Sequence, residues 1–80
     1  MEDKITDFII KNFMNGEGHL SEDTNLFESG IVDSMGFILL LSFIEKELGV
    51  AVNMSEITIE NFDSVRKIAD FIKQKLNKKE

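Results

Sequence analysis

The chain has 80 residues, of which 42% are hydrophobic, and 15 acidic against 9 basic residues give it a net charge of −6. This length allows one small domain, the hydrophobic content excludes wholesale disorder, and the negative charge disfavours nucleic-acid binding because phosphate backbones would repel the protein. No cysteine is present, which excludes disulfides, thiolate metal sites and cysteine nucleophiles. We expect residues 1–80 to form one domain with its core over about residues 3–76 and a frayed tail at residues 77–80.

The first predicted element is an amphipathic helix that ends at Asn15 and Gly16. Its apolar residues recur at helical spacing and are Ile5, Phe8, Ile9 and Phe13. The following segment, up to about Asp33, is long for a loop in a small domain, so we expect it to pack through its own apolar side chains. These side chains are Leu20, Leu26, Phe27, Ile31 and Val32.

The second predicted helix begins near Ser34 and ends at Gly49. Asp33 suits the N-cap position, because its carboxylate can accept hydrogen bonds from free backbone N–H groups, and Ser34 is then the first helical residue. Gly36 carries no side chain, which could ease the approach of another protein. The residues expected to face the core are Phe37, Leu40, Leu41, Ile44 and Leu48. The outer face then carries Met35, Ile38, Leu39, Ser42 and Lys46.

The last part of the chain predicts a connection with one short helical turn, followed by a third long helix. In the connection we expect Val50, Val52 and Ile57 to turn inward and residues 57–61 to form the turn. Asp63 or Ser64 caps the final helix, whose apolar face is Val65, Ile68, Ala69, Ile72 and Leu76. The predicted fold is therefore all-α, a four-helix bundle of three longer helices and a short third helix, with a long first loop.

We do not expect this chain to contain a catalytic site or a metal site. His19 is the only histidine, and Asp33 adjoins Ser34 in sequence, which is poor geometry for a Ser–His–Asp triad. A single histidine without cysteine also excludes the usual zinc spacings. Two interpretations of Ser34 stay open on the residues alone. It is either an ordinary first residue of a helix or an attachment point, since the positive end of the helix would stabilise a phosphate ester on its hydroxyl.

The segment LFESGIVDSMGFILLLSFIEKELGV, residues 26–50, resembles the acyl and peptidyl carrier proteins. The matching elements are Leu26, Phe27, Gly30, Ile31, Asp33, Ser34 and Met35. The later NFDSVRKIADFI helix, the length and the acidity extend the resemblance over the whole chain. The resemblance implies that Ser34 carries 4′-phosphopantetheine, added from coenzyme A by a phosphopantetheinyl transferase. It also implies that Asp33 caps the helix and takes part in transferase recognition, and that the thiol of the cofactor holds an acyl or aminoacyl thioester.

The outer face of the second helix predicts the partner surface of such a carrier. The expected partner-binding residues are Met35, Ile38, Leu39 and Ser42, and the face is apolar near Ser34, whereas fatty-acid carriers are rich in acidic residues there. The alternative for Ile38 and Leu39 is that they pack under the first loop or line a pocket for the bound cargo. We expect a stand-alone, monomeric and cytoplasmic carrier in fatty-acid, polyketide, nonribosomal-peptide or other specialised biosynthesis. Its partners would be the transferase, an acyl- or aminoacyl-loading ligase and synthase enzymes, with no nucleic acid and no transmembrane segment. The alternative is a non-enzymatic acidic helical module that docks a partner through residues 35–39.

Overall fold

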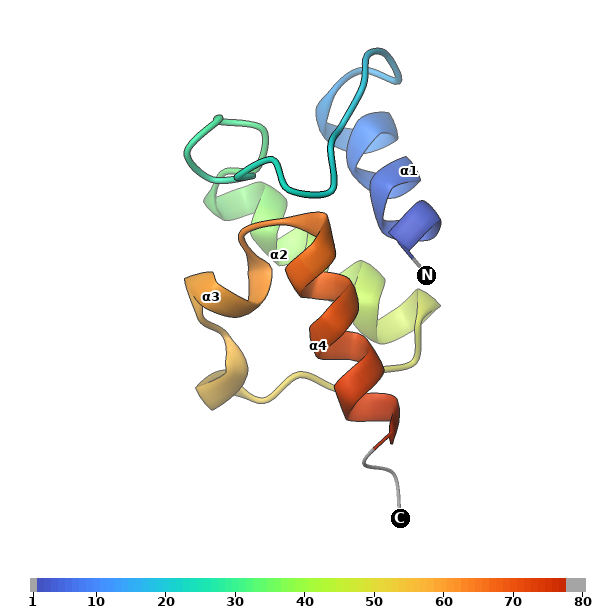
Figure 1. Ribbon diagram of the computed structural model, residues 1–80, viewed down its shortest axis with the longest axis vertical. Helices are drawn as coiled ribbons and strands as arrows, with labels where there is room; N and C mark the ends of the chain where they lie inside the picture. Colours follow the sequence, from blue (N-terminus) through green and yellow to red (C-terminus); the bar gives the residue numbers. More distant parts are fainter. Residues whose placement is uncertain (1, 78–80) are drawn as a thin grey trace.

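The computed structural model describes residues 2–77 and has only helices as regular secondary structure in that range. The elements are α1 (Glu2–Phe13), α2 (Ser34–Glu47), the 3-10 turn η1 (Met54–Glu56), α3 (Ile59–Phe62) and α4 (Val65–Asn77) (Figure 1). The predicted all-α fold, with three longer helices, a short third helix and a long first loop, is confirmed. Asn77 still belongs to α4, and the rest of the expected frayed tail, residues 78–80, lies outside the described residues.

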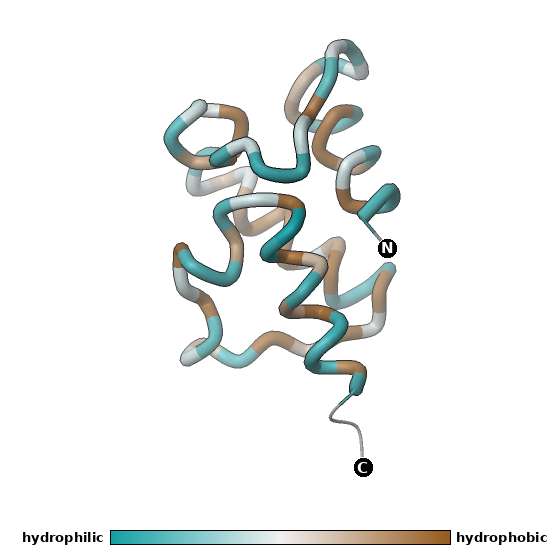
Figure 2. The backbone as a smooth tube through the Cα atoms, viewed as in Figure 1, coloured by the Kyte–Doolittle hydropathy of each residue, from teal (hydrophilic) through white to brown (hydrophobic). Residues whose placement is uncertain are grey.

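The core lies where α4 crosses α1 and α2, and each long helix contributes its predicted apolar stripe (Figures 1 and 2). The fully buried side chains include Ile5 and Ile9 from α1, Leu40 and Ile44 from α2, and Val65, Ile68 and Ile72 from α4. Phe37, Leu41 and Leu48 pack against this core from its edge. Two positions on α4 differ from the expectation. Leu76 is exposed because the helix runs past the core, and Phe71, which was not expected to be buried, packs its ring 5.3 Å from that of Phe62.

The long first loop is held to the body of the protein by both apolar packing and hydrogen bonds. Leu26 and Val32 are buried, and the other expected loop residues, Leu20, Phe27 and Ile31, pack against the core. The Leu26 amide donates to the carbonyl of Asp63 at 2.8 Å, and the Arg66 amide donates to the carbonyl of Glu22 at 3.0 Å. The prediction that this loop packs through its own apolar residues is confirmed.

Three helix ends show the local chemistry expected from the sequence. Asn15 and Gly16 have φ values of 57° and 77° after α1, and Gly49 has a φ of 69° after α2, a region in which glycine carries no steric penalty. At the start of α4, Ser64 is the capping residue, because its hydroxyl accepts the Lys67 amide at 3.2 Å. Within residues 2–77, no helix combines the length and the apolar character needed to cross a membrane.

The second connection differs from the expectation in two ways. The short helix α3 begins at Ile59, and the turn η1 precedes it because Asn53 and Glu56 form a capping box there. Val50 is buried and Val52 packs against the core, as predicted, but the inward orientation predicted for Ile57 is wrong. Ile57 is 37% exposed, since η1 and α3 carry it to the surface between them.

Candidate functional site

Ser34 lies exposed at the first position of α2, and the N-cap interaction of Asp33 fixes its position. The Asp33 backbone is extended, with φ −100° and ψ −170°, and its Oδ1 accepts the Gly36 amide at 2.8 Å. The Asp33 carbonyl accepts a hydrogen bond from the Phe37 amide, also at 2.8 Å. Both the side chain and the backbone of Asp33 thus accept hydrogen bonds from the first turn of α2. The Ser34 hydroxyl therefore lies on a capped helix end beside free N–H groups, where a phosphate ester would be stabilised.

The loop before Asp33 holds this helix end against the core. The Val32 amide donates to the carbonyl of Leu26 at 3.0 Å, and both side chains are buried. Gly30 takes a φ of 81° in the intervening turn, while Asn25 Oδ1 accepts the amides of Phe27 and Glu28 at 3.0 and 2.8 Å. Because this segment is anchored on both sides of Gly30, it sets the direction in which α2 begins.

Gly36 has a different role from the one expected from the sequence. It is buried, so it does not open the surface to an approaching protein. A β-carbon placed on Gly36 would lie 3.1 Å from Cε1 of Phe13 and 3.3 Å from Oδ1 of Asp33. The missing side chain therefore lets the end of α1 pack against the start of α2 and leaves room for the capping carboxylate.

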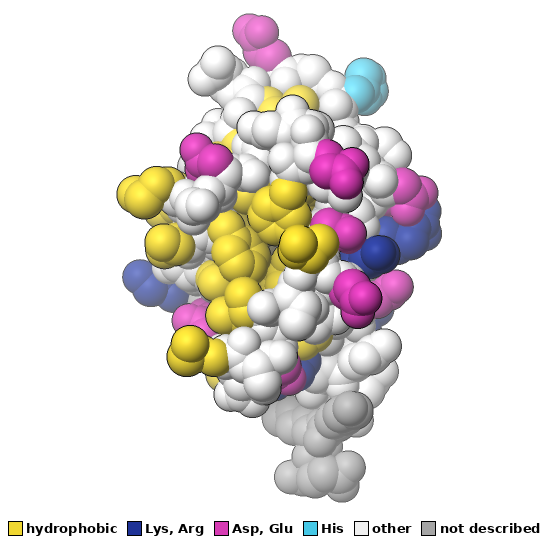
Figure 3. Space-filling model, turned by 90° about the vertical axis from the view of Figure 1, so that its left-hand side faces the viewer, with side chains coloured by type: hydrophobic (Ala, Val, Ile, Leu, Met, Phe, Trp, Pro, Cys, Tyr) yellow, Lys and Arg dark blue, Asp and Glu magenta, His cyan; other side chains and the backbone are white. Residues whose placement is uncertain are grey.

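Exposed hydrophobic side chains of α2, η1 and α3 gather on one side of the molecule (Figure 3). Met35, Ile38 and Leu39 are 71%, 61% and 54% exposed, so the side chains that the sequence places on the outer face of α2 do face solvent. Ser42, one turn further along, is half-buried. We refer to Met35, Ile38 and Leu39, together with the exposed Met54, Ile57 and Ile59, as the apolar face.

The η1 and α3 part of this surface was not predicted from the sequence. Met54 and Ile59 are strongly exposed, and Ile57 and Ile59 line a hollow of about 270 Å³ with Phe27, Phe37 and Thr58. The available signal was the number of apolar residues between Val50 and Phe62, which is more than a single helical turn can bury. The structure thus brings together residues from the first loop, α2 and α3 around one apolar hollow.

A bidentate ion pair joins the first loop to α4 on the protein surface. Arg66 Nε and Nη2 donate to Asp23 Oδ1 and Oδ2 at 2.7 and 3.1 Å, and Arg66 also pairs with Glu22 at 3.1 Å. The hydrogen bond from Arg66 lowers the pKa of the Asp23 carboxyl, and the same contact raises the pKa of Arg66. This pair joins the loop to α4 and is structural, whereas His19 is exposed on the same loop.

A comparison with known protein families gives a match over residues 4–72 to the family described as "Phosphopantetheine attachment site". The chain belongs to this family. The resemblance found in the sequence is confirmed, and the prosthetic group of this carrier protein is a covalently attached 4′-phosphopantetheine. An exposed serine at a capped helix end fits that chemistry, because the group is attached through a phosphodiester.

Known relatives of this carrier cover most of its length. It is 31% identical to the D-alanyl carrier protein of Streptococcus uberis over 96% of both chains. It is 33% identical to the acyl carrier protein PigG of a Serratia species over 92% of this chain and 86% of that one. Among solved structures, a chain described as "Crystal structure of FAD-dependent dehydrogenase" matches with a TM-score of 0.76 and 37% identity, covering 84% of this chain and 96% of that one.

Proposed function

We propose that Ser34 is the residue that bears the prosthetic group and that the protein is a stand-alone carrier of aminoacyl or acyl thioesters. The observation that supports this most directly is the exposed hydroxyl of Ser34 on the capped end of α2, inside the region that matches the family. In the attachment step the Ser34 oxygen bonds to the phosphorus of the phosphopantetheine. The pyrophosphate bond of coenzyme A breaks, and adenosine 3′,5′-bisphosphate leaves.

In this role the chain is a substrate for other enzymes. The free thiol at the end of the arm takes the cargo from an adenylating ligase as a thioester and presents it to the next enzyme. The names of the D-alanyl carrier relatives favour an amino acid as the cargo, whereas the name of the Serratia relative favours an acyl group. We place the aminoacyl thioester first, because more of the relatives are D-alanyl carriers.

Attachment is tested by incubating the purified protein with coenzyme A, Mg²⁺ and a phosphopantetheinyl transferase of broad specificity, followed by intact-mass measurement. We expect a mass gain of one phosphopantetheine, which Ser34→Ala abolishes. Ser42→Ala makes the same chemical change two turns further along α2 and should leave the gain intact. A mass that does not change, or a gain that survives Ser34→Ala, would refute the assignment of Ser34. The mass of the protein isolated from its native cell identifies the thioester cargo.

We further propose that the apolar face is the surface that meets the loading ligase. Met35 and Ile38 follow Ser34 on α2, all members of the face are exposed, and a cluster of exposed apolar residues is typical of interaction sites. Ile38→Glu should slow cargo loading of the phosphopantetheinylated protein by roughly tenfold or more, since a charge is then buried on docking. Leu76→Glu introduces the same charge at an exposed apolar position on α4 and serves as the matched control. Equal loading rates for the two variants would contradict this assignment.

A flavin-dependent dehydrogenase is a second class of partner, and one observation favours it. The solved chain with a TM-score of 0.76 carries the description of an FAD-dependent dehydrogenase structure. Such an enzyme would remove two hydrogens from the thioester-bound cargo and pass them to its flavin. Intact-mass measurement of the loaded carrier after incubation with the enzyme tests this, because the cargo should lose the mass of two hydrogens while the flavin is bleached.

A further inference from the structure

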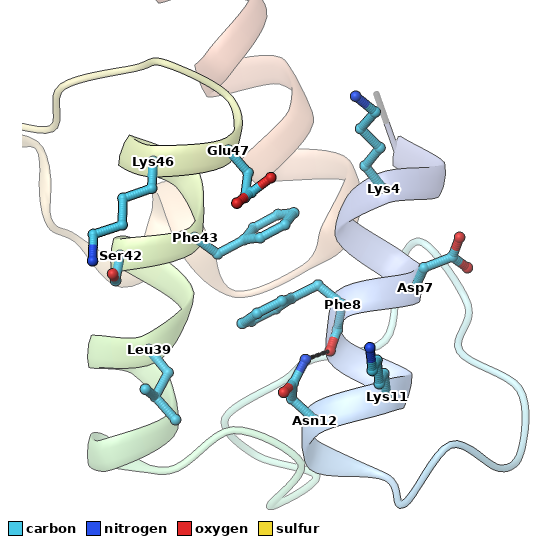
Figure 4. A pocket seen from close by; sticks show the side chains of 10 residues that line it. All are labelled: Lys4, Asp7, Phe8, Lys11, Asn12, Leu39, Ser42, Phe43, Lys46 and Glu47. Atoms are coloured by element: carbon cyan, nitrogen blue, oxygen red, sulfur yellow. Dashed lines mark hydrogen bonds between the residues drawn. The ribbon is translucent and has the colours of Figure 1, made fainter.

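A second concave surface lies between α1 and α2 and borders the outer face of α2, with which it shares Leu39, Ser42 and Lys46 (Figure 4). This α1–α2 groove has a volume of about 630 Å³ and is open to solvent. Its floor is formed by the rings of Phe8 and Phe43, which stack with their centroids 4.2 Å apart and their planes at 19°. Leu39 and Ser42 extend the floor towards the start of α2. The groove thus offers aromatic and aliphatic surface in a cleft, where an inserted side chain could be largely desolvated.

The walls of this groove carry unpaired positive charges. Seven cationic side chains lie within the described residues, and Arg66, Lys67, Lys73 and Lys75 form ion pairs. Lys4, Lys11 and Lys46 are the cations of residues 2–77 without an ion pair, and all three line the groove. Lys4 and Lys11 belong to α1 and Lys46 belongs to α2, so both helices contribute lysines to the groove lining (Figure 4).

The two carboxylates that the described residues contribute to the groove lining form no ion pair with these lysines. Asp7 and Glu47 also belong to the lining, but Asp7 points away from the rings on the outer side of α1, and Glu47 lies at one end beside Phe43 (Figure 4). The three lysines exceed the two acids, whereas the whole chain has 15 acidic residues against 9 basic ones. The groove therefore has the opposite charge balance to the protein as a whole.

We propose that the α1–α2 groove docks an acidic amphipathic segment of a partner protein. An apolar side chain of the segment rests on Phe8 and Phe43, and flanking carboxylates pair with Lys11 and Lys46. Charge complementarity selects an acidic partner, and the concave shape selects a single protein segment over a lipid bilayer, which needs a flat or convex apolar surface. Leu39 belongs to both the groove and the apolar face, so one partner docked near Ser34 could continue into the groove.

The docking is tested with synthetic helical peptides and the ¹⁵N-labelled protein in the Ser34→Ala background, so that the result does not depend on the prosthetic group. One peptide has Leu on one face and Glu on the other, and its partner peptide has Lys in place of every Glu. We expect only the acidic peptide to shift the amide signals of Phe8, Lys11 and Phe43. Lys11→Gln combined with Lys46→Gln should weaken its binding roughly three- to tenfold, and Lys67→Gln combined with Lys73→Gln should not.

Each other outcome overturns the proposal. Equal binding of the two peptides, or shifts centred on Met35 and Ile38, would show that the groove does not select acidic segments. Binding to phosphatidylglycerol vesicles without binding to the acidic peptide would assign the lysines to a lipid surface. Shifts that depend on protein concentration alone would assign the groove to a second copy of this chain. Peptide display gives an independent measurement: sequences selected on the protein and lost with the double Lys→Gln variant should be enriched in Asp and Glu, and neutral or basic sequences would contradict the proposal.

Discussion

Removing the carboxylate of Asp33 tests the physical basis of the Ser34 site. Asp33 Oδ1 accepts the Gly36 amide at 2.8 Å, and in Asp33→Ala this N–H loses its acceptor while the backbone contact to the Phe37 amide remains possible. Loss of such an N-cap lowers the free energy of unfolding by about 1 kcal/mol. For a domain of this size that corresponds to a fall in Tm of about 4–8 °C.

Asp33→Asn separates the hydrogen bond from the charge. The amide oxygen of Asn can accept the same hydrogen bond, and Asn caps helices about as well as Asp. Only the interaction of a full negative charge with the positive end of α2 is lost, so the free energy of unfolding should fall by about 0.5 kcal/mol or less. Urea denaturation followed by circular dichroism measures both variants. Glu28→Ala, which removes an exposed carboxylate from the preceding loop, is the control.

The capping argument is refuted if Asp33→Ala unfolds at the same urea concentration as Glu28→Ala, or if Asp33→Asn is as unstable as Asp33→Ala. The same three variants then test transferase recognition. The resemblance implies that Asp33 takes part in transferase recognition, and we propose that its carboxylate makes the contact. Both Asp33→Asn and Asp33→Ala should then gain phosphopantetheine more slowly than Glu28→Ala. If the transferase attaches phosphopantetheine to Asp33→Asn at the wild-type rate, the role of Asp33 is restricted to the helix cap.

The remaining predictions concern the core, a helix end and the first loop. Ile44 is fully buried, so Ile44→Ala should lower the free energy of unfolding in urea by about 2–5 kcal/mol, whereas Ile38→Ala on the apolar face should change it by less than about 0.5 kcal/mol. Equal costs would mean that the faces of α2 are misassigned. Gly49→Ala should cost about 1 kcal/mol in the same assay, because the φ of 69° is strained for alanine although no atom lies within 4 Å of the added carbon; an unchanged midpoint would contradict this. Arg66 lowers the pKa of Asp23 below its ordinary value of 3.8, so the pair stabilises the fold above that value and this contribution is lost as the pH falls through the lowered pKa. Asp23→Asn should therefore be less stable than the wild type at neutral pH, and a difference that persisted well below pH 3.8 would refute this account.

Local features of the sequence were sufficient to predict the three long helices and the exposed position of Ser34 at a helix end. The helical spacing of Ile5 and Ile9, or of Ile68 and Ile72, depends only on which residues share one side of a helix, so the buried faces could be predicted without knowledge of the fold. The cap by Asp33 spans three residues and is equally local. The resemblance to carrier proteins then pointed to Ser34, which lies exposed at the helix end where it was expected.

Features that join distant segments were decided by the tertiary structure. The role of Gly36 depends on Phe13, which lies on another helix, and sequence spacing gives no information about such an approach. The orientation of Ile57 depends on how the connection folds into η1 and α3 against α4, where Lys75 binds Glu56 at 2.9 Å.

The α1–α2 groove is also a feature that joins distant segments of the chain. Phe8 and Phe43 are 35 positions apart in the chain, and only the packing of the two helices stacks their rings. Lysines that look like ordinary solvent-exposed residues in the sequence become the walls of one groove for the same reason. The sequence by itself thus determined the helices, their buried faces and the position of Ser34 at the start of α2, because these follow from short-range periodicity and capping. The surfaces available to partners were decided only when the helices packed, because their residues come from elements far apart in the chain.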